Sequence, residues 1–183
     1  MISRKQRVLF ADTAKFSVEF PELERYKLKG KVPNVFAVLM NHPRLFKAWG
    51  GLGRYILSEE QSLAPRDREI AILRIGWLNQ AQYEWEQHSD IGRTVGLSED
   101  EIECIKKGPK AGWGRHDAAL VQAADDLFEN SVVSDATWHT LSERYNTQQM
   151  MDLVFTIGTY NLLSWALNSL GVPLDDYLPG AKK

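Results

Sequence analysis

Apolar residues recur at three- and four-residue intervals along most of this chain, which is the spacing of one face of an α-helix. From residue 63 onward, for example, Ile70, Leu73, Trp77 and Leu78 fall on one broad helical face. No run alternates apolar and polar residues at strand length, so we expect no β-sheet. The pattern predicts an all-α fold with helices at about 33–40, 43–58, 65–79, 81–95, 98–106, 116–129, 134–144 and 147–169.

Several predicted helix ends carry residues that favour the start or the end of a helix. Pro43 and Pro65 suit a first helical turn, where the missing N–H of proline costs nothing. Ser98 followed by Glu101 has the spacing of a capping box. Gly171 stands where the longest helix is expected to end, because glycine readily adopts the left-handed conformation of a C-terminal cap.

The first 32 residues lack the helical pattern and contain the breakers Pro21 and Gly30. We therefore expect residues 1–32 to form an irregular arm that packs against the core or a neighbouring subunit. Residues 33–183 are expected to form one domain, a compact bundle of about six to eight helices.

Composition excludes several classes of partner. The chain has 183 residues, 44% of them hydrophobic, and a net charge of -2 with scattered basic residues, so we expect no nucleic-acid partner. No apolar run reaches the length of a membrane span or a signal peptide, so we expect a cytoplasmic protein without a membrane partner. Cys104 is the single cysteine, which excludes an intramolecular disulfide and dithiol chemistry within one chain.

Two carboxylates and a histidine are placed where they could meet. Glu84 and His88 are four residues apart and share one face of a helix. If residues 65–79 and 81–95 fold back on each other, Glu69 lies about 15 Å from the turn and His88 about 12 Å. Facing helices run about 8–10 Å apart, a gap that these side chains can bridge. The spacing is thus compatible with one cluster of Glu69, Glu84 and His88.

Such a cluster would combine an acid and a base, because two carboxylates in a poorly solvated site raise at least one carboxyl pKa. The alternative is an ordinary surface pair of Glu84 and His88, with Glu69 interacting with the helix dipole. A metal bound by the three side chains is chemically possible, but no second histidine lies nearby, and we expect no metal.

Other polar and aromatic residues are weaker candidates. Tyr83 and Trp85 could line an apolar pocket and contact a substrate, although core packing is the more frequent role of such residues. Arg66, Arg68 and Arg74 could bind a substrate carboxylate, but we expect them to be solvated or to contact another subunit.

The run LAPRDREIAILRIGWLNQAQYEWEQHSDIGRTVGLSEDEI, residues 63–102, resembles the core of the carboxymuconolactone decarboxylase and alkylhydroperoxidase D-like superfamily. The peroxidase branch carries two cysteines and a histidine on the second helix and a glutamate on the preceding one. Those positions correspond here to Ala81, Glu84, His88 and Glu69. Because both thiols are absent, a thiol peroxidase reaction is not expected.

The decarboxylase branch carries Glu-x-x-x-His at this place, which Glu84 and His88 match. The resemblance implies a lyase of aromatic catabolism that uses no cofactor, with His88 as proton donor and Glu69 and Glu84 setting its protonation state. It also implies a homo-oligomer, a trimer or a hexamer. The branch's Tyr-x-Gly-x-Pro segment is missing, and residues 112–116 do not replace it.

The resemblance therefore implies an acid-base enzyme acting on a small carboxylate or lactone-type substrate by proton transfer or decarboxylation. A non-catalytic oligomeric protein that binds a small molecule is the alternative. A peroxidase-related protein without the thiol pair is a third reading.

Overall fold

The computed structural model describes residues 4–13, 27–28 and 30–182. Within these residues the chain forms eight α-helices and a short 3-10 helix, Pro179–Lys182, and no β-strand beyond an isolated bridge. The prediction of an all-α fold is confirmed, and each helix begins and ends within two residues of its predicted limits. The helices are α2 (Asn34–Leu39), α3 (Pro43–Leu57), α4 (Pro65–Leu78), α5 (Gln82–Thr94), α6 (Glu99–Lys107), α7 (Arg115–Asn130), α8 (Asp135–Ser142) and α9 (Thr147–Leu170).

The helix ends follow the local signals in the sequence. Pro43 and Pro65 open α3 and α4, and Ser98 and Glu101 form the predicted reciprocal capping box at the start of α6. Gly171 caps α9 in the left-handed conformation with a φ of 66°. A Cβ atom there would lie 2.1 Å from the carbonyl oxygen of Lys5, so the position requires glycine for space as well as for conformation.

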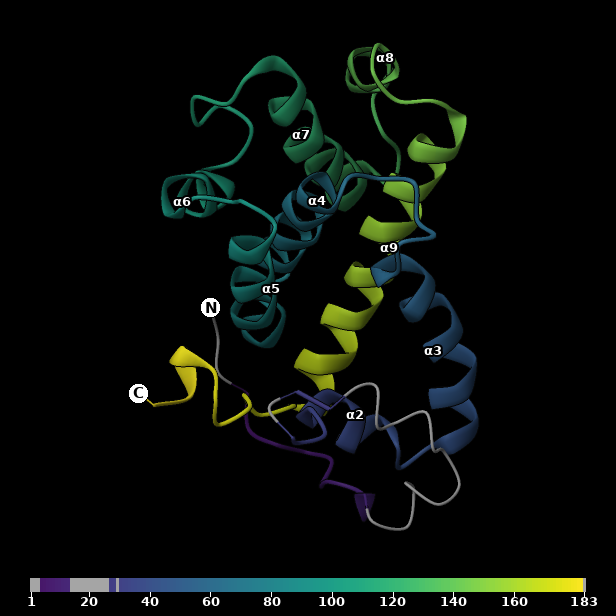
Figure 1. Ribbon diagram of the computed structural model, residues 1–183, viewed down its shortest axis with the longest axis vertical. Coiled ribbons are helices and arrows are strands. Elements are labelled where there is room, and N and C mark those ends of the chain that lie inside the picture. The colour runs from purple at the N-terminus through teal and green to yellow at the C-terminus, as the bar shows by residue number, and fades with distance from the viewer. Residues whose placement is uncertain (1–3, 14–26, 29, 183) are drawn as a thin grey trace.

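Helix α4 lies at the centre of the bundle and contacts α5, α6, α7 and α9 (Figure 1). Every residue from 68 to 76 is buried, which means that α4 has no solvent-facing side over this stretch. Any charged residue in this part of α4 must consequently find a partner inside the protein.

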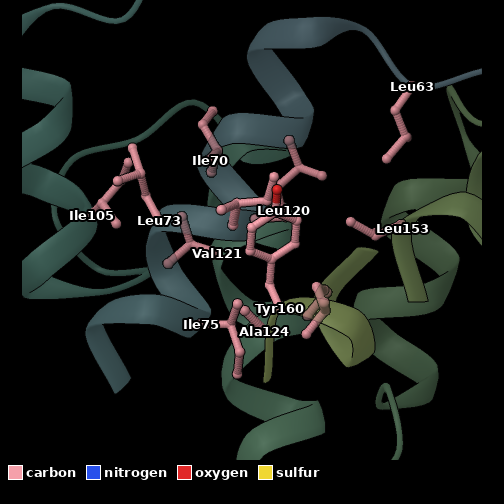
Figure 2. Packing of buried hydrophobic residues seen from close by; sticks show 14 of the residues in the cluster. Leu63, Ile70, Leu73, Ile75, Ile105, Leu120, Val121, Ala124, Leu153 and Tyr160 are labelled. Atoms are coloured by element: carbon pink, nitrogen blue, oxygen red, sulfur yellow. The ribbon is translucent and has the colours of Figure 1, made fainter. Parts of the chain in front are cut away.

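The hydrophobic core forms where α4, α7 and α9 meet (Figure 2). Ile70 of α4, Leu120 of α7 and Leu153 of α9 are fully buried there. Each such side chain contributes roughly 1.5–3 kcal/mol through its removal from water. This core holds α4 and α9 in place, and both helices contribute residues to the candidate site.

The expectation that Arg74 is solvated or lies at a subunit contact is wrong, because it is buried in the centre of the bundle. Its Nε and Nη2 donate to the two carboxylate oxygens of Asp125 at 2.5 and 2.9 Å. Its Nη1 donates to the carbonyl oxygens of Ile105 and Lys106. Arg74 thus joins α4, α6 and α7 through one fully engaged guanidinium.

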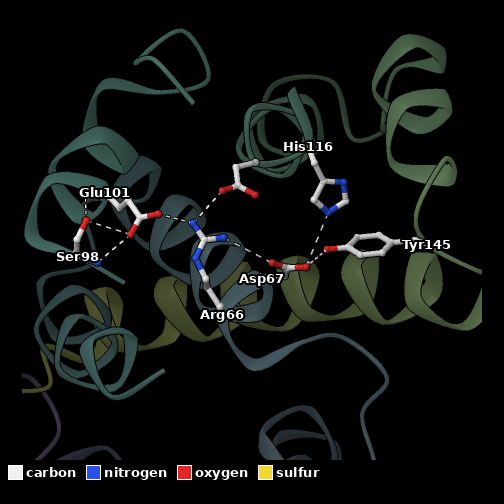
Figure 3. A network of polar contacts seen from close by, with 7 residues as sticks. Arg66, Asp67, Ser98, Glu101, His116 and Tyr145 are labelled. Carbon is white, nitrogen blue, oxygen red and sulfur yellow. Dashed lines mark hydrogen bonds and ion pairs between the residues drawn. The ribbon is translucent and has the colours of Figure 1, made fainter. Parts of the chain in front are cut away.

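A second polar network surrounds the N-terminal end of α4 (Figure 3). Arg66 pairs with Glu101 of α6, while Asp67 accepts a hydrogen bond of 2.5 Å from the hydroxyl of Tyr145. The ring of His116 stacks edge-on against Tyr145 and places Nε2 3.8 Å from Asp67. These contacts hold the start of α4 against α6, α7 and the segment before α9.

The described part of the predicted N-terminal arm lies against its own chain. The backbone N–H groups of Arg7 and Val8 donate to the carbonyl oxygen of Leu170, and that of Ala11 donates to Ala37. Residues 14–26 of the predicted arm lie outside the described residues. Among the helices that the structure describes, none is both long enough and apolar enough to cross a lipid bilayer.

Helix α9 carries large apolar side chains on the face that points away from the core. Met151, Phe155, Leu162 and Trp165 are each 54–56% exposed. Their spacing places them along one side of the helix. We call this set the α9 apolar stripe.

Candidate functional site

The site is built on the hairpin formed by α4 and α5, which confirms the predicted antiparallel pair. The turn is held by the backbone N–H of Ala81, which donates to Gly76 O at 2.9 Å, and by Asn79, which donates to the side chain of Asn161 on α9. A Cβ atom on Gly76 would lie only 3.3 Å from the Cβ atom of Glu84. Glycine at this position therefore allows α5 to approach α4 closely beside Glu84.

The close approach brings Glu69, Glu84 and His88 together. The Nδ1 atom of His88 lies 2.7 Å from Oε2 of Glu69, and its Nε2 atom lies 3.5 Å from Oε2 of Glu84. The side chains are only 1% (Glu69), 3% (Glu84) and 6% (His88) exposed. The predicted convergence of the three side chains is confirmed, and the surface-pair alternative is wrong. Their catalytic role stays a prediction.

Burial and mutual attraction shift the proton affinities of this cluster. Burial raises the pKa of Glu84 to about 7, against an opposing attraction to His88, and the neighbouring charge of Glu69 adds to the rise. Burial alone would lower the pKa of His88, but its attraction to Glu69 and Glu84 outweighs this effect and raises the pKa above its ordinary value. The cluster therefore contains a carboxyl group that exchanges its proton near neutral pH.

Tyr160 of α9 completes the surroundings of His88. Its ring stacks edge-on against the imidazole with the ring centres 4.8 Å apart. Burial, followed by the charges of Glu84 and Glu69, raises the pKa of the Tyr160 hydroxyl well above its ordinary value, so it stays protonated.

Arg68 is a buried cation close to the same cluster. Its Nη1 donates to the carbonyl oxygen of Ser58 at 3.2 Å and lies 3.5 Å from the amide oxygen of Gln61. Its charge opposes the protonation of His88 and lowers that pKa relative to the value the carboxylates alone would give. The expectation of a solvated or subunit-contact role is thus also wrong for Arg68.

Glu84 and His88 line a cavity of about 360 Å³, whereas Glu69 lies behind His88 and outside the lining. The volume is near the lower end of the range of small-molecule sites. The walls come from α2, α3, α5, α9 and the segment before α2, and they are predominantly apolar. The lining comprises Leu28, Pro33, Val35, Phe36, Phe46, Trp49, Gly50, Gly53, Arg54, Leu57, Ser58, Tyr83, Glu84, Gln87, His88, Ile91, Thr159, Tyr160 and Leu163.

Tyr83, predicted to contact a substrate, does line this cavity. Its hydroxyl donates to Asp175 and accepts from the backbone N–H of Val35 at 3.3 Å. Burial and the neighbouring charge of Asp175 raise the pKa of Tyr83. Tyr83 therefore also anchors the C-terminal segment against α2 and α5.

Trp85, the other predicted substrate contact, is not part of the lining among the described residues. It is buried in the core, where its ring lies edge-on against Trp77 with ring centres 5.1 Å apart. The amino group of Lys106 lies 5.2 Å from the centre of the same ring. The geometry thus gives Trp85 a packing role in place of substrate contact.

Sequence reasoning missed the walls that α3 supplies, including Phe46, Trp49 and Leu57. Phe46 and Leu57 precede Glu84 by 38 and 27 positions in the sequence, and no local pattern shows which helix covers α5. The one feature of the α3 sequence that could have indicated a cavity wall is that aromatic residues and three glycines occur together in it. This feature does not identify the helix that α3 faces.

The arrangement gives no obvious metal centre. Among the described residues, no three His, Cys, Asp or Glu side chains are grouped so that they could hold a metal ion. Cys104, the single cysteine, lies on α6 with its Sγ 3.3 Å from the carbonyl oxygen of Ala111, outside the cavity lining.

Comparison with known sequences gives one family match. The model of the carboxymuconolactone decarboxylase family matches residues 43–126, which include the whole α4–α5 hairpin. The uncharacterized protein YdfG of Bacillus subtilis (strain 168) is 23% identical over 111 residues, which cover 59% of this chain and 74% of YdfG.

Solved structures share the fold over almost the whole chain. An uncharacterized peroxidase-related protein of Ralstonia eutropha JMP134, described as an alkylhydroperoxidase AhpD core, superposes with a TM-score of 0.81 at 21% identity over 93% of this chain and 92% of that one. A peroxidase-related protein of Silicibacter sp. TM1040 gives 0.80 at 15% identity over the full length of both chains. The debrominase Bmp8 in complex with 2,3,4-tribromopyrrole gives 0.73 at 17% identity, covering 96% and 95% of the two chains.

Proposed function

We propose that this chain, whose residues 43–126 match the model of the carboxymuconolactone decarboxylase family, is a cofactor-free acid-base enzyme of that family. It would act on a small carboxylate or lactone-type compound by proton transfer or decarboxylation. The observation that carries the proposal is the buried Glu69–His88–Glu84 cluster, two members of which line a predominantly apolar cavity. We assign the catalytic roles to these three residues.

The geometry supports different roles for the two ring nitrogens of His88. Glu69 accepts the hydrogen bond of Nδ1 at 2.7 Å and so fixes the orientation and tautomer of the ring. Nε2 is the nitrogen that remains for a substrate, and it donates the proton to the carbanion or dienolate that the reaction forms. Glu84 lies 3.5 Å away and can return a proton to Nε2 between turnovers.

Thiol peroxidase chemistry is disfavoured, although relatives of the same fold carry peroxidase-related names. The positions that hold the two thiols in the peroxidase branch are Ala81 and Glu84, and neither side chain can attack a peroxide. The fold of Bmp8 accommodates a halogenated pyrrole. This supports a substrate that contains a small ring for the present chain. A binding protein without turnover is the remaining alternative.

An assay over a panel of small lactones and carboxylates tests the proposal. It measures either exchange of the proton beside the carbonyl group or release of carbon dioxide. We expect His88→Gln to lower turnover about 10²–10⁴-fold, the usual contribution of a positioned acid or base. The matched control is His139→Gln, which removes a histidine that is 82% exposed on α8. Circular dichroism shows whether each variant retains the helical fold. Turnover that survives His88→Gln at the wild-type rate contradicts the assignment.

A further inference from the structure

Arg68 is a buried cation without an adjacent acid. Only 8% of the residue is exposed, yet it forms no ion pair with any residue that the structure describes. Its Nη1 contacts the carbonyl oxygen of Ser58 and the amide oxygen of Gln61, and its Nε has no partner among the described residues. Arg74 on the same helix, by contrast, donates to both oxygens of Asp125. Because burying an unpaired charge is costly, the charge of Arg68 must be balanced over a longer distance.

Two neighbouring segments hold the Arg68 side chain in place. Ser58 is the C-cap of α3 and lines the cavity, and its carbonyl oxygen belongs to the negative end of that helix, which attracts a cation. Gln61 extends the contact to α9, because its Nε2 donates to Oγ1 of Thr156 at 2.7 Å. Thr156 precedes Tyr160 by about one helical turn. The guanidinium is thus held between α3, α4 and α9.

The charge of Arg68 balances the charge of the buried cluster. His88 has an acid beside each ring nitrogen, Glu69 at 2.7 Å and Glu84 at 3.5 Å. With both acids ionised and the imidazole protonated, two negative charges and one positive charge leave one negative charge in excess. A guanidinium is protonated at every pH that proteins tolerate, so Arg68 brings the buried group to neutrality.

The other titratable groups around His88 do not supply this balance. Tyr160 stacks on the ring from α9, and its hydroxyl stays uncharged because its pKa lies well above the ordinary value. Arg54 of α3 lines the same cavity, but it is exposed to solvent, which screens its charge. Arg68 is therefore the buried positive charge that offsets the excess.

The position of Arg68 affects how tightly His88 holds its proton. Burial lowers the pKa of His88, Glu69 and then Glu84 raise it above its ordinary value, and the charge of Arg68 opposes the two acids. A general acid works best when its pKa lies near the working pH, because a proton that is held more tightly is transferred less readily. Arg68 thus acts in the direction that favours release of the proton.

We propose that Arg68 is a positioning residue of this site, whose charge offsets the excess negative charge beside His88 and keeps the proton of that ring transferable. Arg68 does this without touching the substrate. The inference rests on the proposed function, to which it adds a residue that sets the strength of the acid. It agrees with a carboxylate substrate, because a cluster without excess negative charge does not repel an anion.

The ring signals of His88, followed by NMR over a series of pH values in the full chain, test the inference without a substrate. The signals are identified by their loss in His88→Gln. Arg68→Met removes the charge and keeps much of the apolar stem. We expect the pKa of His88 to rise by about one unit, as for the loss of a unit charge at about 10 Å and an effective dielectric constant of about 20. Arg68→Lys keeps the charge and should reverse most of the rise.

The matched control is Arg66→Met, the same substitution two residues earlier on α4. It removes a guanidinium that pairs with acids of α6 and α7, and it should leave the pKa of His88 unchanged even where it lowers thermal stability. Adding Glu84→Gln to Arg68→Met removes the excess negative charge and should return the pKa of His88 toward the wild-type value. If Arg68→Met alone does not fold, the double variant is compared with Glu84→Gln, and the same rise of about one unit is expected.

An unchanged or lowered pKa of His88 in Arg68→Met, or an equal rise in Arg66→Met, would overturn the inference. For any member of the lactone and carboxylate panel that is turned over, the alkaline limb of kcat/KM should also move upward in Arg68→Met. A titration shift without turnover would uphold the role of Arg68 toward His88 and count against the proposed catalysis. Turnover that needs His88, with an unmoved titration, would uphold the proposed function and remove the role of Arg68.

Discussion

Replacing Glu84 by glutamine should stabilise the protein at alkaline pH, because it removes a carboxylate that the fold buries. The ordinary pKa of this carboxyl group is 4.5, and burial raises it to about 7 in the folded chain. A raised folded pKa means that the folded state holds the proton more tightly than the unfolded state. The corresponding stability is fully present below pH 4.5 and is lost as the pH rises through about 7.

The size of the effect follows from the same two values. The difference between the two pKa values corresponds to about 3 kcal/mol, at 1.36 kcal/mol per pKa unit. Glutamine has no charge at any pH and therefore avoids this loss. Relative to the wild-type protein, Glu84→Gln should gain about 3 kcal/mol of unfolding free energy between acid and alkaline solution.

Urea denaturation of both proteins at a pH near 5 and at a pH near 8 measures the change. The difference in unfolding free energy between variant and wild type is taken at each pH. Comparing these two differences cancels the contribution of the other titrating groups. Glu86→Gln, on the same helix but only partly buried, serves as the matched control and should give nearly equal differences at both pH values. A pH-independent difference for Glu84→Gln, or a wild-type protein that is relatively more stable at high pH, would refute the reasoning.

Two further outcomes test other parts of the structure. Asp125→Asn should destabilise the fold by about 3–5 kcal/mol in urea denaturation, because it leaves the buried guanidinium of Arg74 without its counter-charge; a loss below about 1 kcal/mol would contradict the role given to this pair. We also propose that the α9 apolar stripe is a subunit contact of a trimer or hexamer, so that Leu162→Glu should lower the mass measured by light scattering; a monomeric wild-type chain would remove that proposal.

The helices could be predicted from sequence because their determinants are local. Apolar spacing, the proline at the start of α3 and α4, and the Ser98–Glu101 capping box act within a few residues of each helix end. The hairpin of α4 and α5 followed as well, since a short connection makes consecutive helices antiparallel neighbours. The rise per residue alone then places Glu69 and His88 at similar distances from the turn between the two helices.

The cavity and the buried arginines depend on contacts that are distant in sequence. Periodicity assigns a face to each helix but not the helix that covers it, so the walls from α3 were not foreseen. Arg74 was expected at the surface because arginine is rarely buried without a partner. Its partner Asp125 lies on α7, and only the all-round burial of α4 makes the pairing necessary.

The position of His88 between two environments supports the proton transfer that we propose at this hairpin. One side of α5 faces α4, where Glu69 holds Nδ1 at 2.7 Å. The other side faces the cavity, where Nε2 and Glu84 stand 3.5 Å apart, too far for a strong hydrogen bond between them. Nε2 is therefore not committed to a strong hydrogen bond with Glu84.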